Sequence, residues 1–325
     1  MALTLTKSLI PALAVMASVM TGVALAQNYP TRPVRVIVPF VPGGSTDIIG
    51  RTVSQKLSEA WGQPVVVDNR GGGATIMGTE IVAKAAPDGY TLMIASASFT
   101  TKLSLVEKLP YDTLADFTPI TLINTTPLVL VVPPESPVKS VKDLIALART
   151  KPGQMNFGSS GLGGSNHLSG ELFNFMAGTK ITHVPYKGNT PALADLMGGR
   201  LDLIFNGATA VLPMVKVGKL RALAVTSKQR ASAAPDLPTL DESGLKGFES
   251  VAFNGMVAPA RTPRDIIAKI NADAVKGINS AETRERLKID GSDPVGSTPE
   301  QFAAFIKEEI AKWAKIIKAA DIKME

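Results

Sequence analysis

Two glycine-rich turns carry the residue types that could hold a small anion. The first turn contains Pro42, Gly43, Gly44, Ser45 and Asp47, between an apolar run typical of a buried strand and an apolar i, i+4 pattern typical of a helix. Glycines let a ligand approach the backbone closely. The free N–H groups and the dipole of the following helix favour negative charge. The sequence therefore predicts an anion-binding turn here.

A second turn repeats this arrangement later in the chain. A short strand is expected at residues 155–158, and a helix follows with Leu168, Leu172 and Met176 on one face. The candidate ligand-binding residues of this turn are Ser159, Ser160, Gly161, Gly164, Ser165 and His167. Asn206, which ends a strand-like run before Gly207, is a further candidate because ligands bind at the carboxyl ends of sheet strands. Two such units predict two lobes that face one ligand.

Several of these residues also have a purely structural interpretation. Asp47 lies in the first turn of its helix, where a carboxylate could cap the helix or contact a ligand. His167 lies in the first turn of another helix, whose positive dipole end disfavours imidazolium, so we expect a neutral ring. That ring could bind the ligand or hold the loop. The serines could be turn and cap residues, although the nearby glycines favour anion binding.

Catalytic and metal-binding constellations are sparse. Ser160 with His167 could form a nucleophile and base, as in a secreted hydrolase, but the surrounding residues do not match G-x-S-x-G. The two histidines, His167 and His183, have no second ligand at metal spacing, so no metal is expected. Phosphate-binding glycine motifs are absent, so no nucleotide cofactor is expected. We therefore expect a protein that is not an enzyme.

Composition narrows the class of protein further. The chain has 325 residues, of which 45% are hydrophobic, enough for two domains with sizeable cores. Its formal net charge is +6, but the lysines and arginines are scattered and not interleaved with aromatics. We therefore expect no nucleic-acid partner. A mildly positive protein suits small anions.

The N-terminus has the pattern of a secretion signal. Lys7 precedes an apolar run over residues 9–25, and Ala24 and Ala26 complete an A-x-A cleavage site. We expect residues 1–26 to be removed and the mature chain to begin at Gln27. The alternative is an uncleaved membrane anchor. The chain has no cysteine, so it has no lipid-attachment site, and we expect a soluble periplasmic protein.

Strand and helix patterns alternate along most of the chain, which predicts an α/β fold. The expected strands are residues 34–40, 65–69, 91–95, 118–123, 128–132, 155–158, 181–184, 201–205, 220–225 and 251–257. The expected helices are residues 47–61, 78–85, 140–148, 192–197 and 282–289, the one after Ser165, and two that begin at the Thr-Pro pairs Thr262-Pro263 and Thr298-Pro299. The apolar stripe of the last helix is expected to be core.

Many short motifs in a fixed order resemble one family. They include Tyr29-Pro30, Arg32-Pro33, Pro39-Phe40, Pro42-Gly43-Gly44 with Asp47, Gly62-Gln63-Pro64, Asn69-Arg70, Pro87-Asp88-Gly89-Tyr90-Thr91-Leu92, Leu109-Pro110-Tyr111-Asp112, Ser159-Ser160-Gly161 with His167-Leu168, His183-Val184-Pro185-Tyr186-Lys187-Gly188, Leu223-Ala224-Val225-Thr226 and Pro238-Thr239. This series resembles the Bug/TctC family, the periplasmic receptors of tripartite tricarboxylate transporters. It covers almost the whole mature chain.

The resemblance implies a fold and a function. It implies a type II-like Venus-flytrap protein of two α/β lobes, each a mainly parallel sheet flanked by helices. The chain would cross between the lobes near residues 122–126 and 250–253, so that lobe 1 is residues 27–122 plus 250–325 and lobe 2 is residues 123–249. A small organic anion, a carboxylate or dicarboxylate, would be held largely by backbone N–H groups of the two turns.

The resemblance also implies partners. A monomeric receptor would deliver its ligand to the large and small integral-membrane subunits of a transporter. A sensory receptor that serves a membrane sensor kinase is the alternative that the sequence leaves open.

The chain departs from the family pattern at several positions. Val41 stands where the family usually has proline, and Phe253 stands where a tryptophan is common. The glycine-rich loop at residues 71–78 lacks the usual proline and second glycine pair. We expect these changes to alter the rigidity of the loop and the rim of the cleft.

Overall fold

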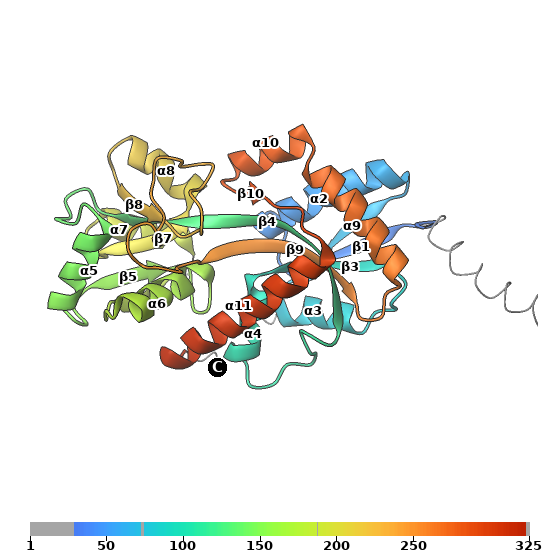
Figure 1. Cartoon of the computed structure of the whole chain (residues 1–325), viewed down its shortest axis with the longest axis horizontal. Helices are drawn as coiled ribbons and strands as arrows, with labels where there is room; N and C mark the ends of the chain where they lie inside the picture. The colour runs from blue at the N-terminus through green and yellow to red at the C-terminus, as the bar shows by residue number, and fades with distance from the viewer. Residues whose placement is uncertain (1–28, 73–74, 187, 323–325) are drawn as a thin grey trace, which may run out of the picture.

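Two long strands connect the two halves of the molecule. In the computed structural model, which describes residues 29–72, 75–186 and 188–322, β4 (Phe117–Val132) and β9 (Val251–Pro259) run side by side between two groups of elements (Figure 1). One group contains the N-terminal elements together with α9 and α10, and the other contains the elements from α5 to β8. The two-lobed α/β architecture is therefore confirmed.

The remaining elements have the following bounds. The other strands are β1 (Val34–Val38), β2 (Val65–Asn69), β3 (Thr91–Ser96), β5 (Asn156–Ser159), β6 (Thr182–Pro185), β7 (Leu203–Gly207), β8 (Arg221–Val225) and β10 (Asp293–Pro294). The helices are α2 (Ser45–Trp61), α3 (Ile76–Ala83), α4 (Ala97–Leu105), α5 (Val141–Thr150), α6 (Ser165–Ala177), α7 (Asn189–Met197), α8 (Ala208–Lys216), α9 (Arg264–Ile278), α10 (Ala281–Ile289) and α11 (Pro299–Ala319).

The strands form a mixed sheet in the order β2-β1-β3-β9-β4-β7-β5-β6, with β8 and β10 also paired to β4. The outer strands of each lobe pair in parallel, as expected: β1 with β2 and β3, and β5 with β6 and β7. The strands near the middle pair antiparallel, namely β9 with β3 and β4, and β4 with β7 and β8. The parallel arrangement therefore holds for the outer part of each lobe, where helices connect successive strands.

The local patterns explain the first strand–turn–helix unit. In α2, Ile49, Val53 and Leu57 are buried on one face, as their i, i+4 spacing predicts. The helix ends at Gly62, whose φ of 63° is the left-handed conformation that glycine adopts easily. The last helix begins as expected, because Thr298 and Gln301 form a reciprocal capping box.

Other elements differ from the expectations. Residues 118–123 and 128–132, expected as separate strands, form the single strand β4. The helices α4 and α8 were not expected from the sequence. The helix expected to be capped by Thr262 begins at Arg264 with Pro263 at the cap position, because the Thr262 hydroxyl donates to the Pro259 carbonyl instead.

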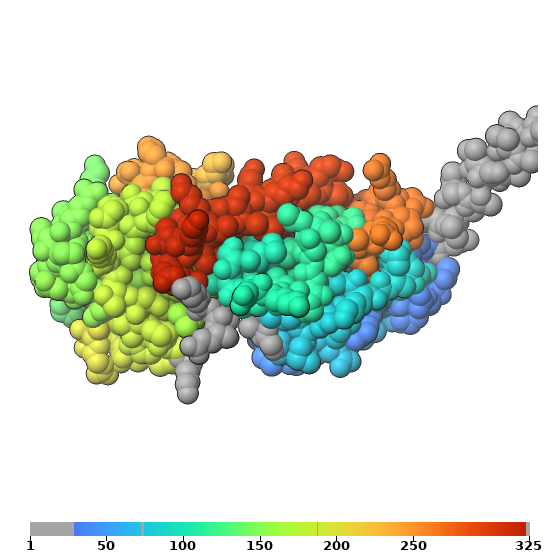
Figure 2. All heavy atoms as spheres, turned by 90° about the horizontal axis from the view of Figure 1, so that it is seen from below, coloured from blue at the N-terminus to red at the C-terminus, as the bar shows by residue number. Residues whose placement is uncertain are grey.

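The helix α11 contributes to the cores of both lobes. Phe302 and Ile306 pack with residues of β3, β9 and α4, whereas Trp313, Ile316 and Ile317 pack with residues of α5, α6 and β7. Figure 2 shows the red atoms of α11 extending from the teal part of one lobe to the yellow-green part of the other. The lobe boundaries given above stay predictions. The helix therefore packs against both lobes.

The described residues contain no helix long and apolar enough to cross a membrane. The expected signal peptide, residues 1–26, lies outside the described residues. Residues 73–74 of the divergent glycine-rich loop also lie outside them.

Candidate ligand-binding site

A cavity of about 400 Å³ lies where the two lobes meet. One lobe contributes Ser45, Ser96 and Asn254, and the other contributes Ser165 and Asn206. The carboxyl ends of β3 and β7 reach the cavity, which agrees with the usual position of ligands in α/β sheets.

The helices α2, α4, α6, α7 and α8 all begin at this cavity. Their N-cap residues are Gly44, Ser96, Gly164, Gly188 and Gly207, and none of these makes a side-chain capping bond. Of the helices that begin elsewhere, α5, α10 and α11 are capped by a side-chain hydroxyl, whereas α3 and α9 have no side-chain capping bond either. The free N–H groups at the cavity are therefore left for a ligand, and the converging dipoles favour an anion.

Side-chain charge contributes little positive potential to the cavity. Among the residues that the structure describes, no lysine, arginine or histidine side chain lines it. Asp290 is the acidic residue in the lining. The described lining residues therefore offer an anion backbone dipoles and neutral donors.

Two buried amide side chains present unpaired atoms beside the cavity. Asn206 accepts a hydrogen bond from the Gly207 N–H at 2.8 Å, but its Nδ2 has no partner. Asn254 donates to the Asn124 Oδ1 at 3.2 Å, but its own Oδ1 has no partner. Both side chains line the cavity. Both unpaired atoms are buried, so a ligand gains affinity by pairing with them only if the amide groups turn toward the cavity.

In the first turn, Ser45 lines the cavity and Gly44 caps α2, but Asp47 points away from it. Its carboxylate accepts N–H bonds from Gly43 at 2.9 Å, Arg51 at 3.0 Å and Asn69 at 2.9 Å. Burial alone would raise the pKa of Asp47, but the hydrogen bonds from Arg51, Gly43 and Asn69 hold the pKa below its ordinary value. Asp47 therefore holds the turn in shape. Of its two interpretations from the sequence, the geometry favours the structural one over a ligand contact.

The other residues of the first turn have backbone roles. Gly43 has a φ of 89°, which a residue with a side chain rarely adopts. Pro42 and Gly43 do not belong to the cavity lining. They set the path along which the chain reaches Ser45.

In the second turn, Gly164 and Ser165 line the cavity, while the preceding serines bond within the protein. The Ser159 hydroxyl donates to the Gly161 carbonyl at 3.0 Å and lies 2.6 Å from the His183 Nε2. The Ser160 hydroxyl donates to the Asn166 Oδ1 at 2.9 Å. Ser159, Ser160 and Gly161 therefore hold the loop, and Gly164 and Ser165 reach the cavity.

The side chain of His167 is buried and holds the preceding loop in place. Its Nδ1 accepts the Gly163 N–H at 3.0 Å, which requires an unprotonated Nδ1, as in the neutral ring that was expected. Its ring stacks on His183 at a centroid distance of 3.8 Å and does not line the cavity. Burial and the neighbouring His167 lower the pKa of His183 to about 3.

The proposed nucleophile and base are not paired. The Ser160 hydroxyl is directed at Asn166, and His167 uses its Nδ1 for the Gly163 N–H. A hydrolase would need these two side chains to bond to each other. The geometry therefore does not support the hydrolase alternative.

Sequence reasoning missed several residues of the lining. Ser96 and Ser98, whose hydroxyls lie 2.9 Å apart, belong to a strand–turn–helix unit at the start of α4. Asn189 lies at the start of α7, and Asn254 lies inside β9. The serines at the end of β3 were a usable signal. Asn254 had no such signal, because a single asparagine within an apolar strand does not reveal which way it points.

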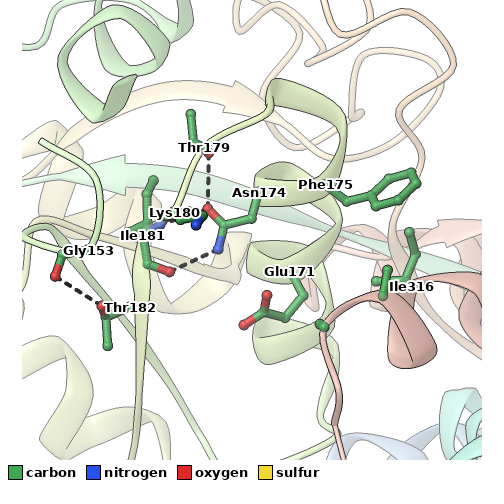
Figure 3. A pocket seen from close by; sticks show the side chains of 11 residues that line it. Gly153, Glu171, Asn174, Phe175, Thr179, Lys180, Ile181, Thr182 and Ile316 are labelled. Carbon is green, nitrogen blue, oxygen red and sulfur yellow. Dashed lines mark hydrogen bonds between the residues drawn. The ribbon is translucent and has the colours of Figure 1, made fainter. Parts of the chain in front are cut away.

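A second hollow, of about 490 Å³, lies between α6 and the end of α11 (Figure 3). Asn174 bonds Thr179 and Ile181 there, and Thr182 bonds the Gly153 carbonyl. The hollow lies beside the C-terminal end of α11, where the helix dipole is negative, and its lining contains one acidic and one basic residue, Glu171 and Lys180. None of the described helices begins at this hollow, so it offers an anion fewer free N–H groups than the cavity between the lobes does.

The comparisons with known proteins identify the family. A model of the tripartite tricarboxylate transporter family receptor, TctC, matches residues 49–322. The chain belongs to this TctC family. BugT of Bordetella pertussis is 38% identical to it over 302 residues, covering 92% of this chain and 93% of BugT. A protein encoded between tcbD and tcbE in Pseudomonas sp. strain P51 is 39% identical, with 92% and 93% coverage.

Solved structures of other TctC and Bug proteins share the fold. Rpa4515 of R. palustris, described with adipate, is 38% identical with a TM-score of 0.76, and the match covers 91% of this chain and all of that one. MatC of Rhodopseudomonas palustris, described with bound malate, is 31% identical with a TM-score of 0.72, covering 89% and 100%. A TctC solute-binding protein from Polaromonas is 27% identical with a TM-score of 0.82, covering 90% and 99%. TctC receptors are periplasmic solute-binding proteins and not enzymes.

Two departures of this TctC chain from the family pattern can be located. Phe253 lines the cavity from β9, is buried, and packs edge-on against Phe305. Val41 is 73% exposed beside the first turn and does not line the cavity. Phe253 therefore bears on the ligand more directly than Val41 does.

Proposed function

We propose that this TctC receptor captures a small carboxylate in the cavity between its lobes and delivers it to the large and small membrane subunits of a tripartite transporter. The observation that carries the proposal is the set of uncapped helix N-termini around a cavity whose described lining residues include no cationic side chain. Such a site attracts an anion by backbone N–H groups and dipoles. Relatives described with adipate and malate support this ligand class.

We infer direct ligand contacts for Ser45, Gly164, Ser165 and Asn206, which line the cavity, and for the backbone of Gly44, which caps α2 next to Ser45 but does not belong to the lining. We infer a supporting role for the candidates that do not line the cavity. These are Pro42, Gly43, Asp47, Ser159, Ser160, Gly161 and His167.

Closure of the lobes would couple binding to transport. A ligand favours the closed form only through contacts that it makes to both lobes. The strands β4 and β9 connect the lobes and supply the hinge, and the Ser232 hydroxyl donates to Asp293 across the gap at 2.5 Å. The membrane subunits would then recognise the closed, loaded receptor as a monomer.

Thermal unfolding of refolded, ligand-free protein tests the proposal. Mono-, di- and amino carboxylates are each compared with the matching amide, which lacks the carboxylate charge. A ligand at a hundred times its dissociation constant adds about 2.7 kcal/mol to the free energy of unfolding. We expect at least one carboxylate to raise the unfolding midpoint while its amide does not.

A pair of variants with the same charge change serves as control. Asn206→Asp adds a negative charge beside the uncapped helices, so we expect the affinity for the carboxylate to fall by at least about a hundred-fold. Asn174→Asp adds the same charge in the other hollow and should leave the affinity unchanged. Equal responses to acid and amide, or equal effects of the two variants, would contradict the proposal.

We also propose that the mature protein is periplasmic and begins at Gln27. Cell fractionation with mass spectrometry of the N-terminal peptide tests this. A membrane-bound chain that retains Lys7 would instead support the uncleaved anchor.

A further inference from the structure

A buried ion pair lies on α11 where the helix passes from one lobe to the other. Ile306 packs in the core of one lobe and Trp313 in the core of the other, and Glu309 and Lys312 lie between them on the helix. The buried Glu309 carboxylate accepts a hydrogen bond from the Lys312 ammonium and another from the Trp313 Nε1 at 2.7 Å. A buried carboxylate is unfavourable unless it is paired in this way, so the pair depends on this exact arrangement of α11.

Lys312 also joins α11 to the start of β9. Its Nζ donates to the Glu249 carbonyl at 3.0 Å, two residues before β9 begins. The next residue, Ser250, is held by the lobe that contains α6 and β8. Its N–H donates to the Thr226 carbonyl at 2.9 Å, and its hydroxyl lies 2.6 Å from the Ser169 hydroxyl. The ion pair therefore fastens α11 to the segment from which β9 crosses to the other lobe.

The helix α11 is a stiff connection between the lobes, beside β4 and β9. It has no glycine, and its one proline, Pro299, is its first residue, so it lacks the residues at which helices usually kink. A movement of one lobe relative to the other must then pull part of α11 away from one of the two cores. No residue of α11 belongs to the described lining of the cavity. The way in which α11 is fastened therefore bears on lobe movement and not on ligand contact.

We propose that Glu309 and Lys312 form a clasp that fastens α11 to the start of β9 and thereby restrains the movement of the two lobes relative to each other. Without the clasp, the second half of α11 can separate from Glu249. Because charge-assisted hydrogen bonds are among the stronger ones, the population of other lobe arrangements should rise about ten-fold. This inference does not depend on which ligand the cavity binds, so it can hold or fail independently of the proposed function.

Distance measurement by pulsed electron paramagnetic resonance on the ligand-free mature protein tests the inference. The chain has no cysteine, so Ala60→Cys on α2 and Ala146→Cys on α5, both exposed and one in each lobe, take the two spin labels. Glu309→Gln removes the negative charge, while its amide oxygen can still accept from Trp313. The Lys312 side chain is 24% exposed and can turn to water, so this variant should fold. We expect its distance distribution to be broader than that of the wild type.

Glu308→Gln is the matched control, because Glu308 is exposed at the preceding position of α11 and loses the same charge. Its distance distribution should equal that of the wild type. The double variant Glu309→Gln/Lys312→Met also removes the bond to Glu249 and should broaden the distribution at least as much as Glu309→Gln does. Urea unfolding shows which variants are folded, and Glu309→Gln alone decides the matter if the double variant is not. A wild-type distribution in folded Glu309→Gln, or equal broadening in Glu308→Gln, would overturn the inference.

Discussion

The substitution Asp47→Ala should separate the shape of the first turn from direct ligand contact. The Asp47 carboxylate holds Gly43, Arg51 and Asn69 by N–H bonds but does not line the cavity. Its removal leaves the Gly43 N–H and the Asn69 amide without this acceptor. We therefore expect both the stability and the ligand affinity to fall, although no atom in contact with the ligand is removed.

The magnitude follows from the three bonds. A hydrogen bond to a charged group is worth about 1.5–3 kcal/mol when buried, and the Arg51 side chain is 53% exposed, so its bond adds little. The sum is about 3 kcal/mol. With an unfolding entropy of roughly 0.6 kcal/mol/K for a chain of this size, the midpoint should fall by about 5 °C. Reordering about one residue of the turn on binding should weaken the ligand roughly ten-fold.

The effect should depend on pH with a defined sign. Because the pKa of Asp47 is held below its ordinary value, its contribution to stability is complete above that value and is lost as the pH falls through the folded-state pKa. The difference in free energy of unfolding between wild type and Asp47→Ala should therefore be full near neutral pH and shrink in acid, below about pH 4.

Urea unfolding at several pH values and calorimetric titration measure the two effects. Asn174→Ala is the matched control, because it removes an amide with bonds to Thr179 and Ile181 in the other hollow. It should lower stability by a similar amount without changing affinity. A midpoint for Asp47→Ala within 1 °C of wild type, or an equal loss of affinity in both variants, would refute the reasoning.

Three further predictions concern the hinge, the core and pH. Ser232→Ala removes the bond to Asp293 between the lobes, so ligand release in stopped flow should accelerate several-fold; an unchanged rate would show that the bond does not hold the closed form. Gly170→Ala would place a Cβ 2.2 Å from the Phe157 ring, so urea unfolding should show a loss of about 2–3 kcal/mol, and a neutral effect would contradict this packing. The pKa of His183 is lowered to about 3, so between pH 7.5 and pH 5 the unfolded chain binds a proton that the folded chain does not. The free energy of unfolding of the wild type should therefore fall over this pH range. Urea unfolding should show a smaller fall in His183→Gln, and equal falls in the two proteins would contradict the buried, neutral ring.

Local patterns predicted some elements well and others poorly. The strand at residues 65–69 and the unit of β1, turn and α2 were predictable because apolar spacing and glycine placement act over a few residues. The helix α8 was missed because Pro213 lies inside it, and proline normally breaks a helix. The threonines in α4 have weak helix propensity, so that helix was missed as well.

The strand β4 shows how pairing overrides local signals. Pro119 and Pro127 interrupt the strand pattern, and the ladder with β9 shifts register near Pro119 and again near Leu122. The strand nevertheless continues, because β9 pairs with its first part and β7 and β8 pair with its last part. The continuous connection between the lobes therefore depends on partners that lie far away in the sequence.

The sequence by itself determined the two glycine turns, the helices that follow them and the family, because these depend on residue types within short windows and on their order. Only the tertiary structure decided which turn residues face the cavity. Asp47 points away from the cavity because Asn69, on the next strand, donates a hydrogen bond to it. His167 also points away from the cavity, because its ring stacks on His183 from another strand. It also brought Asn254 and Asp290 to the same cavity. Side-chain direction depends on such long-range packing and pairing, which no local pattern encodes.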